Sequence, residues 1–160
     1  MSVSFQDRSL PEPQKITLPA ELESLAAFRR FVEASCAGRP GIDQQFIYDL
    51  VLAVDEACTN IITHGYAGMD PGSIMLACQV GAGKVVLTIT DFGHPFEPYE
   101  PDRPEVDLAL EDFPEEVFGL YFIYQSTDEV DYEAGEDGNH LVLTKHIRLS
   151  PSPALGEGLG

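Results

Sequence analysis

The sequence has few positive charges. It has nine Lys and Arg residues against 27 Asp and Glu, which leaves a formal net charge of −18. A protein with this charge repels nucleic-acid phosphates, and the chain has no basic stripe with interleaved aromatic residues, so we do not expect DNA or RNA binding. The acidity favours either solubility alone or a basic protein partner. It also requires that a nucleoside triphosphate arrive with a cation and be held by backbone amides.

Long apolar runs and metal-binding motifs are also missing. No apolar run approaches the roughly 20 residues that span a bilayer, and the N-terminus lacks the basic start and apolar segment of a signal peptide. We therefore expect a cytoplasmic protein that does not enter a membrane. Cys36, Cys58 and Cys78 lack metal-ligand spacing and the four histidines form no His-x-x-x-His pair, so we expect buried, reduced thiols and no zinc site.

The chain length and composition predict one folded domain. A chain of 160 residues, 44% of them hydrophobic, is long enough to bury a real core. Residues 1–13 are polar and contain two prolines, so we expect a flexible N-terminal arm. The folded domain is expected over residues 14–148, and residues 149–160 are expected to be a disordered tail.

The hydrophobic periodicity predicts helices over residues 22–37 and 43–64. Alternating patterns and turn residues predict short strands, several of them joined as hairpins: residues 15–18, 73–80, 84–90, 129–132 and 140–147. Residues 95–116 contain five prolines and nine acids, which favours a long loop, and a short helix is expected to begin at Gly119. This order predicts an α+β fold, a two-layer sandwich with a mostly antiparallel sheet and helices on one face.

The most informative motif is Asp55-Glu56-Ala57-Cys58-Thr59-Asn60, inside the second predicted helix. Residues four apart share a helix face, so Glu56 and Asn60 point the same way. A carboxamide is a suitable ligand for Mg²⁺, and a carboxylate beside it can deprotonate a hydroxyl or a water. The same helix face carries Asp49 and Thr63. Because the residues flanking this polar stripe are apolar or small, we expect it to face a pocket, although such stripes are usually solvent faces.

Two later segments add to this motif. Asp91-Phe92-Gly93-His94-Pro95-Phe96 follows a strand; a carboxylate there can accept a hydrogen bond from an exocyclic amine, and a glycine lets a flat ring approach. The same residues also suit an ordinary turn. Gly119-Leu120 is expected at a helix N-terminus, where unpaired N–H groups attract phosphate.

The three segments, in this order and spacing, resemble the ATP-binding superfamily of gyrase B, heat-shock chaperones and sensor histidine kinases, which has the Bergerat-type fold. Within it, Asp55 to Tyr66 is most similar to the anti-sigma-factor serine kinases of bacterial partner-switching systems. The segments Thr127 to Val130 and Gly138 to Lys145 agree with that branch. The resemblance covers roughly residues 14–148.

The resemblance implies roles for single residues in binding ATP and Mg²⁺. Glu56 would be the general base, and Asn60 would bind the magnesium ion. Asp91 would accept the adenine amino group, with Gly93 beneath the ring and Thr144 supporting Asp91 directly or through water.

Further nucleotide-contacting residues follow from the same resemblance. Gly119 and Leu120 would belong to the phosphate-binding end of a lid, and Phe96 ends the Asp91 motif. His64 would be a rim residue, or a plain residue at a helix end.

The implied function is that of a serine-protein kinase that phosphorylates an anti-sigma-factor antagonist and sequesters a sigma factor or similar regulator. A homodimer is left open.

The family's lid usually ends in an arginine-bearing Gly-x-Gly segment, whereas this chain has Glu115, Glu116 and Val117 there. This departure supports the alternative of a non-catalytic, nucleotide-sensing or nucleotide-free binding protein. Lys84 and Arg103 are the candidates for replacing the missing positive charge. The catalytic domain of a histidine kinase is disfavoured, because the chain has no helical hairpin carrying a phosphoacceptor histidine.

Overall fold

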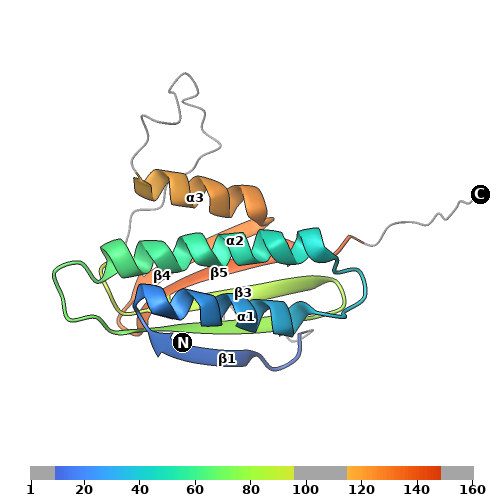
Figure 1. Cartoon of the computed structure of the whole chain (residues 1–160), viewed down its shortest axis with the longest axis horizontal. Coiled ribbons are helices and arrows are strands. Elements are labelled where there is room, and N and C mark those ends of the chain that lie inside the picture. Colours follow the sequence, from blue (N-terminus) through green and yellow to red (C-terminus); the bar gives the residue numbers. More distant parts are fainter. Residues whose placement is uncertain (1–9, 96–114, 149–160) are drawn as a thin grey trace, which may run out of the picture.

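The structure, a computed structural model, describes residues 10–95 and 115–148 (Figure 1). Five strands form one sheet in the order β1-β2-β3-β5-β4, and every pairing is antiparallel. The strands are β1 (Gln14–Pro19), β2 (Ser73–Val80), β3 (Lys84–Asp91), β4 (Glu129–Gly135) and β5 (Gly138–His146). The predicted Phe96 and Arg103, and nearly all of the predicted long loop, lie outside the described residues.

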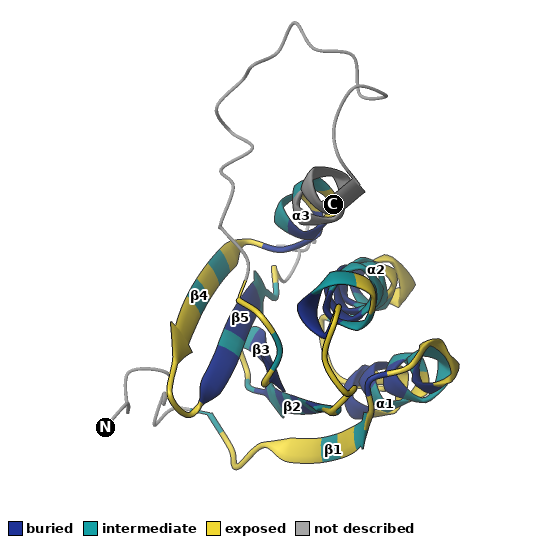
Figure 2. Ribbon diagram, turned by 90° about the vertical axis from the view of Figure 1, so that its left-hand side faces the viewer, coloured by how far each residue is buried: buried dark blue, intermediate teal, exposed yellow. Residues whose placement is uncertain are grey.

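The helices lie on one face of this sheet (Figure 2). They are the single-turn η2 (Leu22–Ser24), α1 (Leu25–Cys36), α2 (Gln44–Asn60), the π-helical turn η3 (Ile61–Gly65) and α3 (Glu115–Ser126). Helices α2 and α3 pack against each other and run in opposite directions, so the first turn of α3 lies near the C-terminal end of α2 (Figure 1). The predicted two-layer α+β sandwich is confirmed. No helix in the described part of the chain is both long and apolar enough to cross a bilayer.

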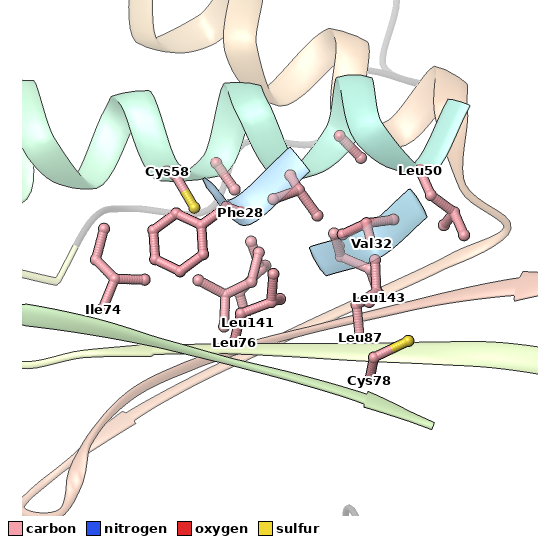
Figure 3. Packing of buried hydrophobic residues seen from close by; sticks show 14 of the residues in the cluster. Phe28, Val32, Leu50, Cys58, Ile74, Leu76, Cys78, Leu87, Leu141 and Leu143 are labelled. Carbon is pink, nitrogen blue, oxygen red and sulfur yellow. The ribbon is translucent and has the colours of Figure 1, made fainter. Parts of the chain in front are cut away.

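The core lies between the two layers and follows from the strand periodicity. Along β2, every second residue from Ile74 to Val80 is buried and the residues between them are partly exposed. These side chains meet Phe28 of α1 and Leu50 of α2, which are fully buried (Figure 3). All three cysteines are buried and free, as expected.

Helix α3 starts earlier than the sequence predicts. The expected start was Gly119, but the helix begins at Glu115, and Gly119 is its fifth residue. The physical reason is that a single glycine is tolerated inside a helix at a modest cost, so Gly119 does not by itself mark where the helix begins. Gly119 therefore lies past the unpaired N–H groups of the first turn, and the prediction that it offers them to a phosphate is wrong. Val117 lies inside the helix, where a positive φ is not needed.

Candidate functional site

Helix α2 begins with a side-chain cap and ends in an irregular turn. Asp43 caps its N-terminus, with Oδ1 accepting a hydrogen bond of 2.9 Å from the N–H of Phe46. After Asn60 the helix widens into the π-helical turn η3, and the N–H of Tyr66 donates to the carbonyl of Ile61 over 3.1 Å. Such π-helical turns are rare and are frequent at functional sites. The sequence pattern gave no signal for it.

Asn60 directly precedes this widened end and Glu56 lies one turn before Asn60; both residues are half-buried. Neither side chain has a hydrogen-bond or ion-pair partner among the described residues. The rest of the predicted polar stripe is engaged: Asp49 forms an ion pair of 3.3 Å with Lys145, and the hydroxyl of Thr63 donates to the carbonyl of Thr59. The stripe is therefore structural at its two ends, and only Glu56 and Asn60 remain available to a ligand.

Partial burial raises the pKa of Glu56, and the neighbouring carboxylate of Asp55 raises it further. Asp55 itself accepts a hydrogen bond of 2.9 Å from Nε of Arg29 on α1. A glutamate with a raised pKa is a stronger proton acceptor when ionised, which suits a general base.

Asp91, at the end of β3, is only 4% exposed. Its Oδ1 accepts two hydrogen bonds, from the N–H of Gly93 over 2.8 Å and from Nδ2 of Asn139 over 3.0 Å. Its Oδ2 has no hydrogen-bond donor in the described part of the chain. A buried carboxylate oxygen without a donor is costly. This oxygen is the acceptor that an exocyclic amine of a purine would satisfy.

The ends of α2 and β3 meet through the backbone at Gly65 and Gly93. The N–H of His94 donates to the carbonyl of Gly65 over 2.6 Å. A Cβ at Gly93 would overlap that same carbonyl. The glycine at position 93 is thus required by close chain packing, whether or not a ring also lies on it. A Cβ at Gly65 would come 3.9 Å from Oδ1 of Asp91.

Tyr66 fastens this junction further. Its hydroxyl accepts a hydrogen bond from the N–H of Phe92 and donates to the carbonyl of Ser73, each over 2.9 Å. Asp91 also lies near enough to the buried thiol of Cys58 on α2 to contribute to its raised pKa, after burial itself and Asp55. Two of the three predicted segments, the Glu56–Asn60 face and the Asp91 turn, therefore lie at one end of the molecule.

Thr144 does not contribute to the candidate site around Asp91. It pairs with Val86 in the sheet, whereas Asp91 pairs with Asn139. Five residues along a strand separate Thr144 from Asn139 by roughly 17 Å, so neither a direct contact nor one bridging water connects Thr144 to Asp91. The predicted support is wrong, and Asn139 provides it. The signal for Asn139 was its place directly after Gly138, at the start of the strand paired with β3.

The other predicted residues are distributed as follows. His64 lies in η3, half-buried, next to the junction. Gly119 and Leu120 lie in the first half of α3, which packs against α2. Lys84 is at the opposite end of β3, roughly 23 Å of strand from Asp91.

Comparison with known proteins agrees with this geometry. The family model described as "Histidine kinase-like ATPase domain" matches residues 18–145. The chain belongs to the histidine kinase-like ATPase domain family. It is 29% identical over 146 residues to the serine-protein kinase RsbW of Bacillus thuringiensis (strain Al Hakam) and to that of Bacillus cereus (strain AH187), and each match covers 86% of both chains.

Two solved structures have a similar fold. The crystal structure of the RsbU and RsbW domains of Rv1364c from Mycobacterium tuberculosis superposes with a TM-score of 0.61 at 23% identity. It covers 88% of this chain, which corresponds to 34% of that longer chain. A blue-light activated histidine kinase from Erythrobacter litoralis gives a TM-score of 0.51 at 16% identity, over 81% of this chain and 42% of that one.

A histidine kinase-like ATPase domain implies a nucleotide and a magnesium ion, and the residues of this chain fit both. The unsatisfied Oδ2 of buried Asp91 suits an adenine amino group. The described residues contain no group of three or more His, Cys, Asp or Glu side chains that would hold a metal unaided. A magnesium ion here would depend on the carboxamide of Asn60, on water and on the phosphates of the nucleotide, which is its usual manner of binding.

Proposed function

We propose that this chain is an ATP- and magnesium-dependent serine-protein kinase that acts as an anti-sigma regulatory factor. The observation that carries the proposal is the meeting of two features at one end of the molecule: a buried Asp91 with one unsatisfied oxygen, and a helix face where Glu56 and Asn60 have no partner in the described part of the chain. The similarity to proteins named serine-protein kinase RsbW supports the choice of a serine as acceptor.

Each residue then has one task. Asp91 holds the adenine amino group through Oδ2, and Asn139 and the N–H of Gly93 keep its carboxylate in place through Oδ1. Asn60 would bind the magnesium ion. When bound, ATP would supply the phosphoryl group, and the magnesium ion would offset the negative charge of the phosphates. Glu56 accepts the proton of the serine hydroxyl, a role for which its raised pKa and partial burial are suited.

The proposed partners are proteins. The phosphoryl acceptor is a serine of an anti-sigma-factor antagonist, and the sequestered protein is a sigma factor or similar regulator. A homodimer belongs to the same proposal. The net charge of −18 is compatible with a partner surface rich in Lys and Arg.

Nucleotide binding is tested by following the thermal midpoint with ATP and with ADP, with and without Mg²⁺. A nucleotide that binds only the folded state raises the midpoint by mass action. Asp91→Asn should weaken ATP binding about 30- to 100-fold. The substitution puts an amide NH2 group in place of the charged Oδ2, so the adenine amino group would face a donor instead of an acceptor. The matched control is Asp131→Asn on β4, an exposed aspartate of the same sheet, which should bind as wild type does. No midpoint shift in the wild type at saturating ATP would contradict the proposal.

Magnesium dependence is tested with Asn60→Ala. The substitution removes the carboxamide ligand without adding a charge, so the gain in ATP affinity on adding Mg²⁺ should fall by about tenfold. Titrations with and without Mg²⁺ measure this ratio. An unchanged ratio would refute the role of Asn60.

Phosphoryl transfer is tested with radiolabelled ATP and the small antagonist proteins encoded next to the gene, followed by mapping of the labelled residue. Glu56→Gln should lower the transfer rate about a hundredfold or more while ATP still binds; Glu33→Gln, at an exposed acid of α1, should leave the rate unchanged. Binding without transfer in the wild type would favour the alternative of a nucleotide-sensing protein that acts by association alone.

A further inference from the structure

An ion pair between Arg29 and Asp55 joins α1 to α2 directly beside Glu56. Helix α2 lies between α1 and α3, and both neighbours pack against it (Figure 2). From the α1 side, Nε of Arg29 donates a hydrogen bond of 2.9 Å to Oδ1 of Asp55. Asp55 directly precedes Glu56 in α2. Two carboxylates are therefore neighbours in the helix, and only that of Asp55 has a cation as partner among the described residues.

This ion pair contributes little to the stability of the fold. The side chains of Arg29 and Asp55 are 41% and 33% exposed, and ion pairs with this exposure stabilise a protein by at most about 1 kcal/mol. In the described part of the chain it is the only ion pair between α1 and α2. Its place beside the candidate base is therefore more informative than its strength.

Asp55 acts on Glu56 through its charge rather than through contact. Adjacent residues of a helix do not face each other, so the two carboxylates point in different directions. A nearby negative charge still makes the ionised form of Glu56 less favourable. Burial raises the pKa of Glu56 most, and the charge of Asp55 raises it further. A cation held on Asp55 offsets part of that second effect.

The other titratable groups at this end of the molecule come from three elements. His64 lies in η3, Asp91 ends β3, and α3 begins with Glu115 and Glu116. All of them stay in place when Arg29 or Asp55 is replaced, so the effect of the ion pair can be measured against a constant background.

We propose that Arg29 is a positioning residue for the phosphoryl transfer. It holds the Asp55 carboxylate against α1 and offsets its charge, so that Glu56 stays ionised, and able to accept the serine proton, down to a lower pH. This role of Arg29 rests on the proposed role of Glu56 as the general base.

The first test follows the titration of the Glu56 carboxyl by NMR, with isotope-labelled glutamate in the full-length protein, without nucleotide or Mg²⁺. The signal is assigned by its loss in Glu56→Gln. Arg29→Met leaves the charge of Asp55 without its counter-ion, so the midpoint of Glu56 should rise by about half a pH unit. Arg30→Met, at the next and exposed residue of α1, is the matched control and should leave the midpoint unchanged. An unchanged midpoint in Arg29→Met would overturn the proposal.

A double variant tests whether Arg29 acts through Asp55. Asp55→Asn removes the neighbouring charge, so the midpoint of Glu56 should fall by about half a pH unit. Adding Arg29→Met to Asp55→Asn should change the midpoint no further. An equal rise with and without the Asp55 carboxylate would show that Arg29 acts on Glu56 directly, and the positioning role would be wrong. Arg29→Lys keeps the positive charge and should stay closer to the wild type than Arg29→Met does.

The pH dependence of phosphoryl transfer to the acceptor protein connects the titration to the reaction. The pH at which the rate falls to half on the acid side should rise in Arg29→Met and fall in Asp55→Asn, in parallel with the NMR midpoints. Shifted midpoints with an unshifted rate profile would contradict Glu56 as the base, and with it the proposed function. Unshifted midpoints in a protein that still transfers phosphate would overturn the role of Arg29 alone.

Discussion

Polar side chains near Lys145, at one end of the sheet, are paired, whereas those near Asp91, at the other end, are only partly paired. At the Lys145 end, a charged side chain only 14% exposed has an ion-pair partner in Asp49, a carbonyl partner in Ser126 at the end of α3, and the ring of Phe46 at 5.3 Å. At the other end, Asp91 is buried with one oxygen unsatisfied, and Asn60 has no partner in the described chain.

This difference separates structural polar groups from functional ones. A buried polar group costs free energy unless it is paired, so pairing is expected wherever the fold alone decides. The Lys145 end meets that expectation and fastens the C-terminal end of α3 to α2 and β5. The Asp91 end does not meet it, and the backbone contact between Gly65 and Gly93 holds it together instead. Four substitutions test the comparison.

The largest effect is expected for Gly93→Ala. The added Cβ would overlap the Gly65 carbonyl, so the ends of β3 and α2 must separate, and the free energy of unfolding should fall by about 2–3 kcal/mol. Urea denaturation measures this. The control is Gly83→Ala in the β2–β3 turn, where a Cβ meets nothing within 4 Å and the change should stay within about 0.5 kcal/mol. Equal stabilities of the two variants would show that the junction does not depend on close packing.

A smaller loss is expected for Lys145→Met at the other end. The substitution keeps the apolar stem but removes the ion-pair partner of Asp49, which keeps its hydrogen bond from Gln45, and the donor to the Ser126 carbonyl. The loss should be about 1–2 kcal/mol. ATP affinity, measured by the same titration as above, should not change. Lys15→Met on β1, an exposed lysine, is the control. A large loss of ATP affinity in Lys145→Met would mean that the two ends are not separate in function.

The smallest expected effects are changes of the unfolding free energy with pH, and these changes have opposite signs at the two ends of the sheet. Burial, and then Asp55, raise the pKa of Glu56 above its ordinary 4.5. The folded state therefore holds this proton more tightly than the unfolded state does. The stabilising contribution of Glu56 is complete below pH 4.5 and is lost as the pH rises through the raised value. Glu56→Gln should be more stable than the wild type at neutral pH, as expected for a residue kept for function.

Asp128, near the Lys145 end, should show the reverse. Burial opposes its ionisation, but the N–H of His146, at 2.7 Å, and the guanidinium of Arg148 lower its pKa below the ordinary 3.8. Its stabilising contribution is present above pH 3.8 and is lost as the pH falls through the lowered value. Asp128→Asn should be less stable at neutral pH, with the difference vanishing in acid. Unfolding free energies across a pH series check both variants, and a common sign for Glu56→Gln and Asp128→Asn would contradict the contrast.

Local patterns were sufficient to predict most elements, with shifted ends. The alternation in residues 73–80 and the helical spacing after Asp43 are strong because each element buries one face. The π-helical turn at Ile61–Gly65 could not be predicted, since it depends on how the chain turns towards β3. The predicted start of α3 at Gly119 is wrong because one glycine does not by itself end or begin a helix, and this helix begins at Glu115.

The two-layer fold and the candidate site residues Glu56, Asn60 and Asp91 could be predicted from the sequence, because spacing along a helix and position at a strand end are local properties. Which residues meet at that site depends on contacts between distant parts of the chain. The antiparallel register places Asn139, and not Thr144, opposite Asp91, and packing pairs Asp49 with Lys145 while leaving Asn60 without a partner in the described chain. Register and pairing join residues far apart in the chain, and no local pattern of a single sequence specifies them.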